Sequence, residues 1–193
     1  ELNALVEPTT HEAWLEQIRE WQAEYPMVIP ESKNGVLHAQ YVLSELNKIA
    51  KDDAIIVSDV GQHQMWAAQF YEFRHPRQFI TSGGLGTMGF GLGAAMGAQV
   101  ANPDKKVINI AGDGSFHMNC NELSTLAKYQ IPMMELVVDN SVLGMVRQWQ
   151  KLFYDNRFSQ TTQDKKTDFV KLAEAFGVKA FEIHTKDELI PVL

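Results

Sequence analysis

The chain has 193 residues, of which 45% are hydrophobic and 21% are charged, which is ordinary globular composition with enough apolar side chains for a core. Its formal net charge of −7 argues against nucleic acid or an anionic membrane as a partner, because both require clustered Lys and Arg. A single cysteine excludes an intrachain disulfide, and no apolar run approaches the roughly 20 residues of a membrane span. We therefore expect a cytoplasmic protein that binds neither nucleic acid nor membrane.

The N-terminal part has the pattern of one amphipathic helix, over residues 11–25, followed by two prolines and a polar linker. We interpret residues 1–33 as a helix and linker that belong to a preceding domain, and residues 34–193 as a second domain. The chain begins with Glu rather than Met, and residues 187–193 have the pattern of a helix that is just beginning. We expect the sequence to be a piece of a longer polypeptide, truncated at its C-terminus.

From residue 35 onward, the apolar periodicity predicts strands and helices in alternation. Strands are predicted at 54–61, 77–82, 106–115, 133–140 and 179–184. Helices are predicted at 36–50, 62–71, 86–101, 121–130, 143–154 and 168–177. A capping box is predicted at the start of the helix at 121–130, with Asn119 as N-cap and Glu122 three residues later. This alternation predicts an α/β fold, a parallel sheet with helices on both faces.

A glycine cluster raises the question of which ligand the domain binds. Residues 84–89 match the G-x-G-x-x-G pattern of dinucleotide-binding turns, and they follow a short apolar run. Binding of NAD would require an acidic residue roughly 20 residues further on, to hold a ribose. Asp113 comes close to that spacing, but it lies between two glycines just before a predicted helix. This setting suits a turn that approaches an anion better than it suits a ribose contact.

A diphosphate bound through a metal ion accounts for the polar residues at more of the predicted strand ends than NAD does. Mg²⁺ prefers oxygen ligands, which Asp113 and Asn140 can supply from the ends of two predicted strands, with the backbone carbonyl of Val142 as a third. The backbone N–H groups of Gly114 and Ser115 can bind phosphate oxygens at the start of the following helix. The spacing therefore favours a metal–diphosphate site over a dinucleotide site.

The motif around these residues resembles that of thiamine-diphosphate enzymes, in which Gly-Asp-Gly is followed after roughly 25 to 30 residues by Asn. With GQHQMW at 61–66, the glycine-rich stretch 80–116 and GMVRQWQ at 144–150, the chain resembles the C-terminal domain of acetohydroxyacid synthases, also called acetolactate synthases. The resemblance runs from about residue 35 to the end. It implies a thiamine-diphosphate-binding (pyrophosphate) domain, in which the glycine cluster holds the aminopyrimidine ring of the cofactor and does not bind NAD.

The resemblance also implies individual roles. Gln62 and His63 reach the diphosphate. The carbonyl of Gly86 accepts a hydrogen bond from the pyrimidine amino group, and Met88 supports the bent cofactor with its side chain and its N–H. Trp149 helps to select the second 2-keto acid. The candidate site thus comprises the catalytic residues Met88, Met145 and Trp149, the cofactor-binding residues Gln62, His63, Gly86, Met88, Gly112, Asp113, Gly114, Ser115, Asn140 and Met145, and the Mg²⁺ ligands Asp113, Asn140 and Val142.

The implied activity is that of a thiamine-diphosphate-dependent carboligase, a transferase of isoleucine, valine and leucine biosynthesis. It decarboxylates pyruvate and joins the two-carbon unit to pyruvate or 2-ketobutyrate. The implied cofactors are thiamine diphosphate and Mg²⁺, with FAD bound mainly outside this chain. The implied partners are a second subunit, in a homodimer or higher oligomer, and a regulatory small subunit. Because the glutamate that activates the cofactor lies in an N-terminal domain of the family, we expect the chain to be inactive alone.

The chain departs from the usual family sequence at two positions, and two other interpretations of its function stay open. Asp139 stands where the family usually has a second Asn, and Gly93 stands where Pro is common. One alternative is another thiamine-diphosphate enzyme, such as a pyruvate oxidase, a decarboxylase or a FAD-independent acetolactate synthase, although the helix with Trp149 argues against these. The other is a non-catalytic nucleotide-binding module.

Overall fold

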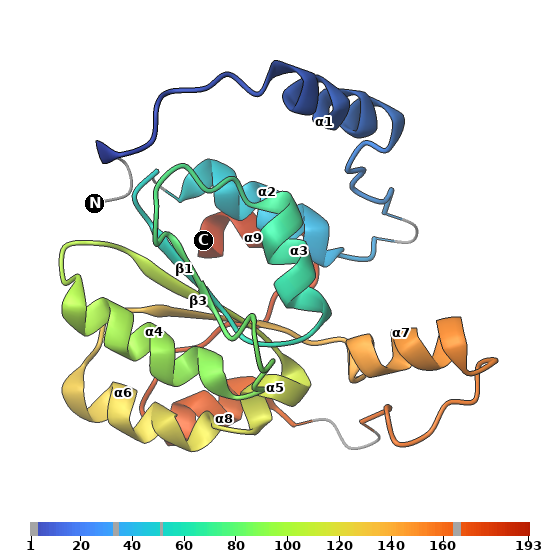
Figure 1. Ribbon diagram of the computed structural model, residues 1–193. Coiled ribbons are helices and arrows are strands. Elements are labelled where there is room, and N and C mark those ends of the chain that lie inside the picture. The colour runs from blue at the N-terminus through green and yellow to red at the C-terminus, as the bar shows by residue number, and fades with distance from the viewer. Residues whose placement is uncertain (1–3, 33–34, 51, 164–166) are drawn as a thin grey trace.

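The computed structural model describes residues 4–32, 35–50, 52–163 and 167–193. Its centre is a four-stranded parallel sheet with the strand order β2-β1-β3-β4 (Figure 1). The strands are β1 (Ile55–Ser58), β2 (Phe79–Thr81), β3 (Val107–Gly112) and β4 (Met134–Val138). Ile56 of β1 is in register with Phe79 of β2 and Ile108 of β3, and Ile108 is in register with Met134 of β4. The predicted parallel α/β sheet is confirmed.

Helices cover both faces of this sheet (Figure 1). One face carries α2 (Ala39–Ile49), α3 (Gln62–Phe70) and α9 (Lys186–Val192), and the other carries α4 (Phe90–Ala101), α6 (Leu123–Tyr129) and α8 (Phe169–Ala175). Two short elements, α5 (Asp113–His117) and the 3₁₀ turn η2 (Cys120–Glu122), connect β3 to α6. None of the helices in the described residues combines the length and the apolar character needed to cross a membrane.

The core is divided between the two faces by the alternation of side chains along the strands. Ile56, Ile108 and Ile110 pack with Leu43 and Leu46 of α2 on one face. On the other face, a cluster packs beneath α4; it consists of Ile55, Val57, Ala95, Ala98 and Val107. Because both faces are covered, β1 and β3 are apolar and buried almost throughout, as is usual for strands of a parallel sheet.

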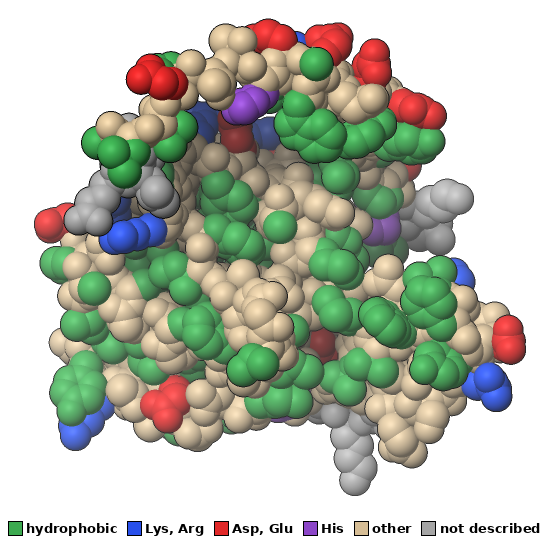
Figure 2. Space-filling view, viewed as in Figure 1, with side chains coloured by type: hydrophobic (Ala, Val, Ile, Leu, Met, Phe, Trp, Pro, Cys, Tyr) green, Lys and Arg blue, Asp and Glu red, His purple; other side chains and the backbone are tan. Residues whose placement is uncertain are grey.

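Two helices lie outside this core, α1 (Glu12–Glu24) and α7 (Gly144–Phe153), and neither contains a buried residue. In Figure 1, α1 lies across the top of the molecule and α7 projects to one side. The rings of Trp14 and Trp21 on α1 pack edge to face at 5.7 Å. Figure 2 shows hydrophobic side chains on the inner side of α1 and over α7, and acidic side chains along the outer edge of α1.

Several boundaries differ from those predicted. The strand predicted at 179–184 is wrong: this segment pairs with no strand in the described part of the chain, and Phe181 is 57% exposed. The capping box is also wrong, because α6 begins only at Leu123 and the side chain of Asn119 donates to the carbonyl of Gly89 at 3.2 Å. The glycine-rich helix begins at Phe90, four residues later than predicted. The predicted domain boundary at 33–34 lies outside the described residues and stays a prediction.

Candidate functional site

The side chains that follow β1, β3 and β4 gather at the carboxyl end of the sheet. A small cavity of about 40 Å³ opens there, and most of the predicted cofactor and metal residues line it. These lining residues are Gln62, His63, Met88, Gly112, Asp113, Gly114, Ser115, Asn140 and Val142. Parallel sheets place their ligand sites at this end because loops from neighbouring strands converge there.

His63 lies at the bottom of this cavity, on the first turn of α3, with only 5% of its surface exposed. Burial lowers the pKa of its imidazole to about 4, so the ring is neutral at pH 7. Its Nε2 atom finds no hydrogen-bond partner among the described residues, although buried polar atoms normally have one. A Cβ added at Gly112 would lie 2.9 Å from Nδ1 of this ring, so a glycine is needed for the close approach. A ligand oxygen at Nε2 would satisfy the ring.

Gln62, the first residue of α3, is hydrogen-bonded across the cavity. Its Nε2 donates to Oε1 of Gln148 on α7 at 3.0 Å. Gly144, the first residue of α7, passes so close to Gln62 that an added Cβ would contact its Oε1. The first turns of α7 are thus held beside the cavity by Gln62, the residue to which the family resemblance gives a contact with the diphosphate.

Asp113 supplies the buried carboxylate of the site, with 3% of its surface exposed. Burial and, to a lesser extent, the nearby carboxylate of Asp139 together raise its pKa to about 6. The turn after β4 folds on itself: Oδ1 of Asn140 accepts from the N–H of Val142 at 3.1 Å, and Oδ1 of Asp139 accepts from the N–H of Ser141 at 2.9 Å. Carboxylate, amide and carbonyl oxygens meet here, and a divalent cation would offset the repulsion between the two acids. The donor set fits Mg²⁺.

The side chain of Ser115 stabilises the turn that leads from β3 into α5. Oγ of Ser115 lies 3.1 Å from both the N–H and the carbonyl of Gly112, accepting from the first and donating to the second. A Cβ added at Gly114 would collide with the side chain of Leu143. The structure thus uses the Ser115 hydroxyl to close the turn, and the predicted phosphate contacts remain with the backbone N–H groups of Gly114 and Ser115.

The glycine segment predicted to hold the pyrimidine is a surface loop between β2 and α4. Gly86 has a φ of 65°, a left-handed conformation that glycine adopts easily, and Leu85 is 95% exposed. Met88 is half-buried and lines the cavity, whereas Gly86 does not. The loop is joined to the sheet by the buried carboxylate of Asp59, which accepts from the N–H of Gly89 at 2.9 Å. Asp59 is not among the candidate site residues that the sequence indicates.

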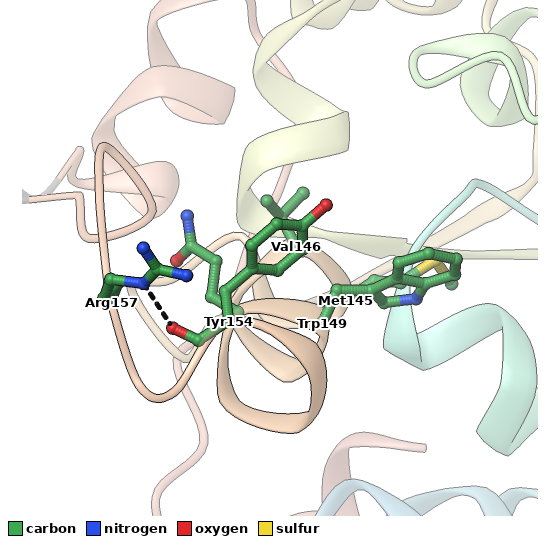
Figure 3. Close-up of a pocket in the computed structure, with 6 residues that line it drawn as sticks. Met145, Val146, Trp149, Tyr154 and Arg157 are labelled. Atoms are coloured by element: carbon green, nitrogen blue, oxygen red, sulfur yellow. Dashed lines mark hydrogen bonds between the residues drawn. The ribbon is translucent and has the colours of Figure 1, made fainter.

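Met145 and Trp149 lie elsewhere, in an open hollow of about 720 Å³ beside α7. Figure 3 shows them together on one side of this hollow, with Val146, Tyr154 and Arg157 around the rest. Trp149 is 57% exposed. Their common face on α7 follows from their spacing of four residues. The hollow is separate from the cavity of Asp113, so the predicted contact of Met145 with the cofactor stays a prediction.

Residues 59–193 match the family described as "Thiamine pyrophosphate enzyme, C-terminal TPP binding domain". The chain belongs to this family of thiamine pyrophosphate enzymes. The match confirms thiamine diphosphate as the cofactor of this family, whereas the Mg²⁺ ion and the individual strand-end residues stay predictions.

Curated relatives narrow the resemblance to one enzyme. The chain is 48% identical over 180 residues to the mitochondrial acetolactate synthase catalytic subunit of Saccharomyces cerevisiae, covering 91% of this chain and 26% of that protein. It is 49% identical over 189 residues to the acetolactate synthase large subunit of Parasynechococcus marenigrum, covering 97% and 30%. For the large subunit of acetolactate synthase isozyme 2 of Escherichia coli, the identity is 44% over 194 residues, covering 97% and 34%. The chain spans about a third or less of these relatives.

A solved structure has the same fold. It is the thiamine diphosphate-dependent 4-hydroxybenzoylformate decarboxylase of Rhodococcus jostii, with a TM-score of 0.76 and 28% sequence identity. The similarity covers 84% of this chain and 31% of that one.

Proposed function

We propose that this chain is the part of an acetolactate synthase that binds the diphosphate of thiamine diphosphate together with Mg²⁺. The observation that carries the proposal is the cavity at the carboxyl end of the sheet, which is lined by the buried carboxylate of Asp113 and by the imidazole of His63, whose Nε2 has no hydrogen-bond partner among the described residues. The identities of 44–49% to acetolactate synthases support the choice of this enzyme within the family.

The metal would be held by Asp113, the amide oxygen of Asn140 and the backbone carbonyl of Val142. It would screen the two carboxylates of Asp113 and Asp139, and would keep Asp113 ionised although burial raises its pKa to about 6. This charge balance makes cation binding and diphosphate binding depend on each other.

The diphosphate would lie against His63, with the backbone N–H groups of Gly114 and Ser115 and the side chain of Gln62 around it. A neutral His63 would donate a hydrogen bond from Nε2 to a phosphate oxygen, and its low pKa keeps the ring uncharged throughout the physiological range. Gln62 would exchange its bond to Gln148 for a phosphate oxygen. Binding of the cofactor would thus change how α7 is held.

The remaining residues orient the cofactor and the substrate. Gly86 and Met88 would contact the pyrimidine ring, and Met145 and Trp149 would line the space for the second 2-keto acid. When bound, thiamine diphosphate supplies the carbanion stabilisation that lets a 2-keto acid lose CO₂. The chain supplies the geometry, and the apolar Trp149 side of the hollow favours a substrate with an added methylene.

For the whole enzyme, we propose pyruvate and 2-ketobutyrate as substrates and a homodimer or larger homo-oligomer as the assembly. FAD would bind mainly outside this chain, and a regulatory small subunit would be a further partner. The lone Cys120 is a free thiol, in keeping with a reducing compartment such as the cytoplasm. The activating glutamate would come from the partner subunit.

Two measurements test the proposal: the melting temperature of the chain with different ligands, and the product that the natural enzyme forms from pyruvate. A ligand raises the melting temperature only of a protein that binds it in its folded state, so Mg²⁺ with thiamine diphosphate should raise it and NAD should not. The natural enzyme that carries this sequence should then form 2-acetolactate from pyruvate. Acetaldehyde or acetyl phosphate as the main product would instead assign the chain to a decarboxylase or an oxidase.

A further inference from the structure

Asp59, the residue directly after β1, is buried to 1% exposure, and its carboxylate accepts hydrogen bonds from the backbone. Oδ1 accepts from the N–H of Val60 at 2.7 Å and from that of Gly89 at 2.9 Å, while Oδ2 accepts from the N–H of Gly91 at 3.0 Å. Two of these donors belong to the start of α4, whose N-cap, Gly89, has no side chain of its own to satisfy them. A side chain from the loop after β1 therefore caps this helix.

Asn119 holds the same glycine from the opposite side. Its Nδ2 donates to the carbonyl of Gly89 at 3.2 Å, reaching it from the turn that follows α5. Gly89 itself has a φ of 87°, and a Cβ added to it would lie 3.0 Å from Cβ of Met118. The residue is thus fixed at its N–H, at its carbonyl and by close packing, and its positive φ and the close approach of Met118 favour glycine here.

The loop before Gly89 has few other attachments. Its hydrogen bonds at Gly86 and Thr87 go to Ser82 within the same loop, at 3.1 Å each, and residues 83–87 are exposed. Met88 follows directly and points into the cavity of Asp113. The position of Met88 relative to the metal–diphosphate residues is consequently set at Gly89.

We propose that Asp59 and Asn119 are positioning residues, which clamp Gly89 between them and so hold the Gly86–Met88 segment at the correct distance from the diphosphate site. This inference rests on the proposed function, because it assigns the segment to the pyrimidine end of thiamine diphosphate. It extends that function by two residues that touch neither the metal nor the diphosphate. Both act on the pyrimidine end of the cofactor through their hydrogen bonds to Gly89.

Two substitutions of nearly equal size break the clamp. Asp59→Asn replaces one accepting oxygen with an NH₂ group, which would face a backbone N–H. Asn119→Asp replaces the donor with a second acceptor, which would face the carbonyl of Gly89. Exposed residues offer matched controls with the same change of charge: Asp104→Asn for the first and Asn121→Asp for the second.

The experiment measures two dissociation constants by calorimetry in the natural protein that carries this sequence. One is for thiamine diphosphate and the other for inorganic diphosphate, both with saturating Mg²⁺. Each clamp variant should raise the Kd of thiamine diphosphate by about 10-fold while the Kd of inorganic diphosphate stays within about 2-fold, as expected for loss of one hydrogen bond that positions one end of the ligand. Both controls should match the wild type.

Equal weakening of both ligands would overturn the inference, because a general loss of structure acts on the whole site. Unchanged binding of thiamine diphosphate in both clamp variants would overturn it as well. Wild-type protein that binds neither ligand would refute the proposed function and the clamp together. If Asp59→Asn does not fold, as judged by circular dichroism, Asn119→Asp and Asn119→Ala decide the matter, since Asn119 is only partly buried.

Discussion

Glu135 on β4 should make the stability of the chain depend on pH. It is in register with Asn109 on β3, and Nδ2 of Asn109 donates to its two carboxylate oxygens at 2.8 and 2.9 Å. Burial, with a smaller contribution from the carboxylate of Asp59, raises the pKa of Glu135 from 4.5 to about 8 against the lowering effect of the Asn109 hydrogen bond. At neutral pH the folded chain therefore carries a proton here that the unfolded chain has released.

The sign and size of the effect follow from this difference. Between pH 4.5 and pH 8, the folded state binds one more proton than the unfolded state at this residue, so stability falls as the pH rises. The slope is about 1.4 kcal/mol per pH unit, which gives roughly 3 kcal/mol between pH 4.5 and pH 7. Glu135 is only partly buried, which reduces this figure toward about 2 kcal/mol.

The assay is urea unfolding of the 193-residue chain at pH 5 and pH 7.5, for the wild type and for Glu135→Gln. The amide of Gln has nearly the shape of the protonated acid and can still pair with Asn109. At pH 5 the two proteins should differ by less than about 1 kcal/mol, whereas at pH 7.5 the variant should be more stable by about 2–3 kcal/mol. The exposed Glu174→Gln serves as the control. Parallel stability curves for the wild type and Glu135→Gln would refute the argument.

Three further predictions concern the site. In the natural enzyme, Asp113→Ala should raise the Mg²⁺ and cofactor concentrations needed for half activity by about 10-fold or more, because a charged ligand is lost; unchanged cofactor affinity would contradict the metal assignment. Trp149→Leu should lower the preference for 2-ketobutyrate over pyruvate by about 1–2 kcal/mol, the scale of a methylene in an apolar pocket, measured as the product ratio from mixed substrates. The purified 193-residue chain should fold and self-associate but form no acetolactate when supplied with Mg²⁺, thiamine diphosphate, FAD and pyruvate; turnover near the rate of an intact enzyme would place the activating acid within it.

The sheet and the position of the site could be predicted because both depend on local patterns. Strand β3 is buried over its six residues and leads directly into Gly-Asp-Gly, which places Asp113 at the carboxyl edge whatever its neighbours are. Asn140 follows β4 in the same way. Because parallel strands end at a common edge, their spacing in sequence is enough to bring the two residues together.

The failures have a different origin, since they depend on contacts between distant segments. Residues 179–184 alternate like a strand, but alternation does not reveal whether a sheet edge pairs with them. Asn119 has the spacing of a helix cap, yet its side chain is engaged by Gly89, 30 residues earlier in the sequence. The spacing of Met145 and Trp149 predicts their shared face on α7, whereas their contacts with cofactor and substrate stay predictions.

The placement of α7 outside the core affects how this protein can change during evolution. None of its residues is buried, so substitutions on its outer surface disturb no packed neighbour and should alter the free energy of unfolding by less than about 0.5 kcal/mol. The metal and diphosphate residues lie instead on turns anchored in the sheet, where most changes are costly. A lineage can therefore vary the shape of the hollow around Trp149, and with it the substrate preference that we propose for this hollow, without first acquiring extra stability.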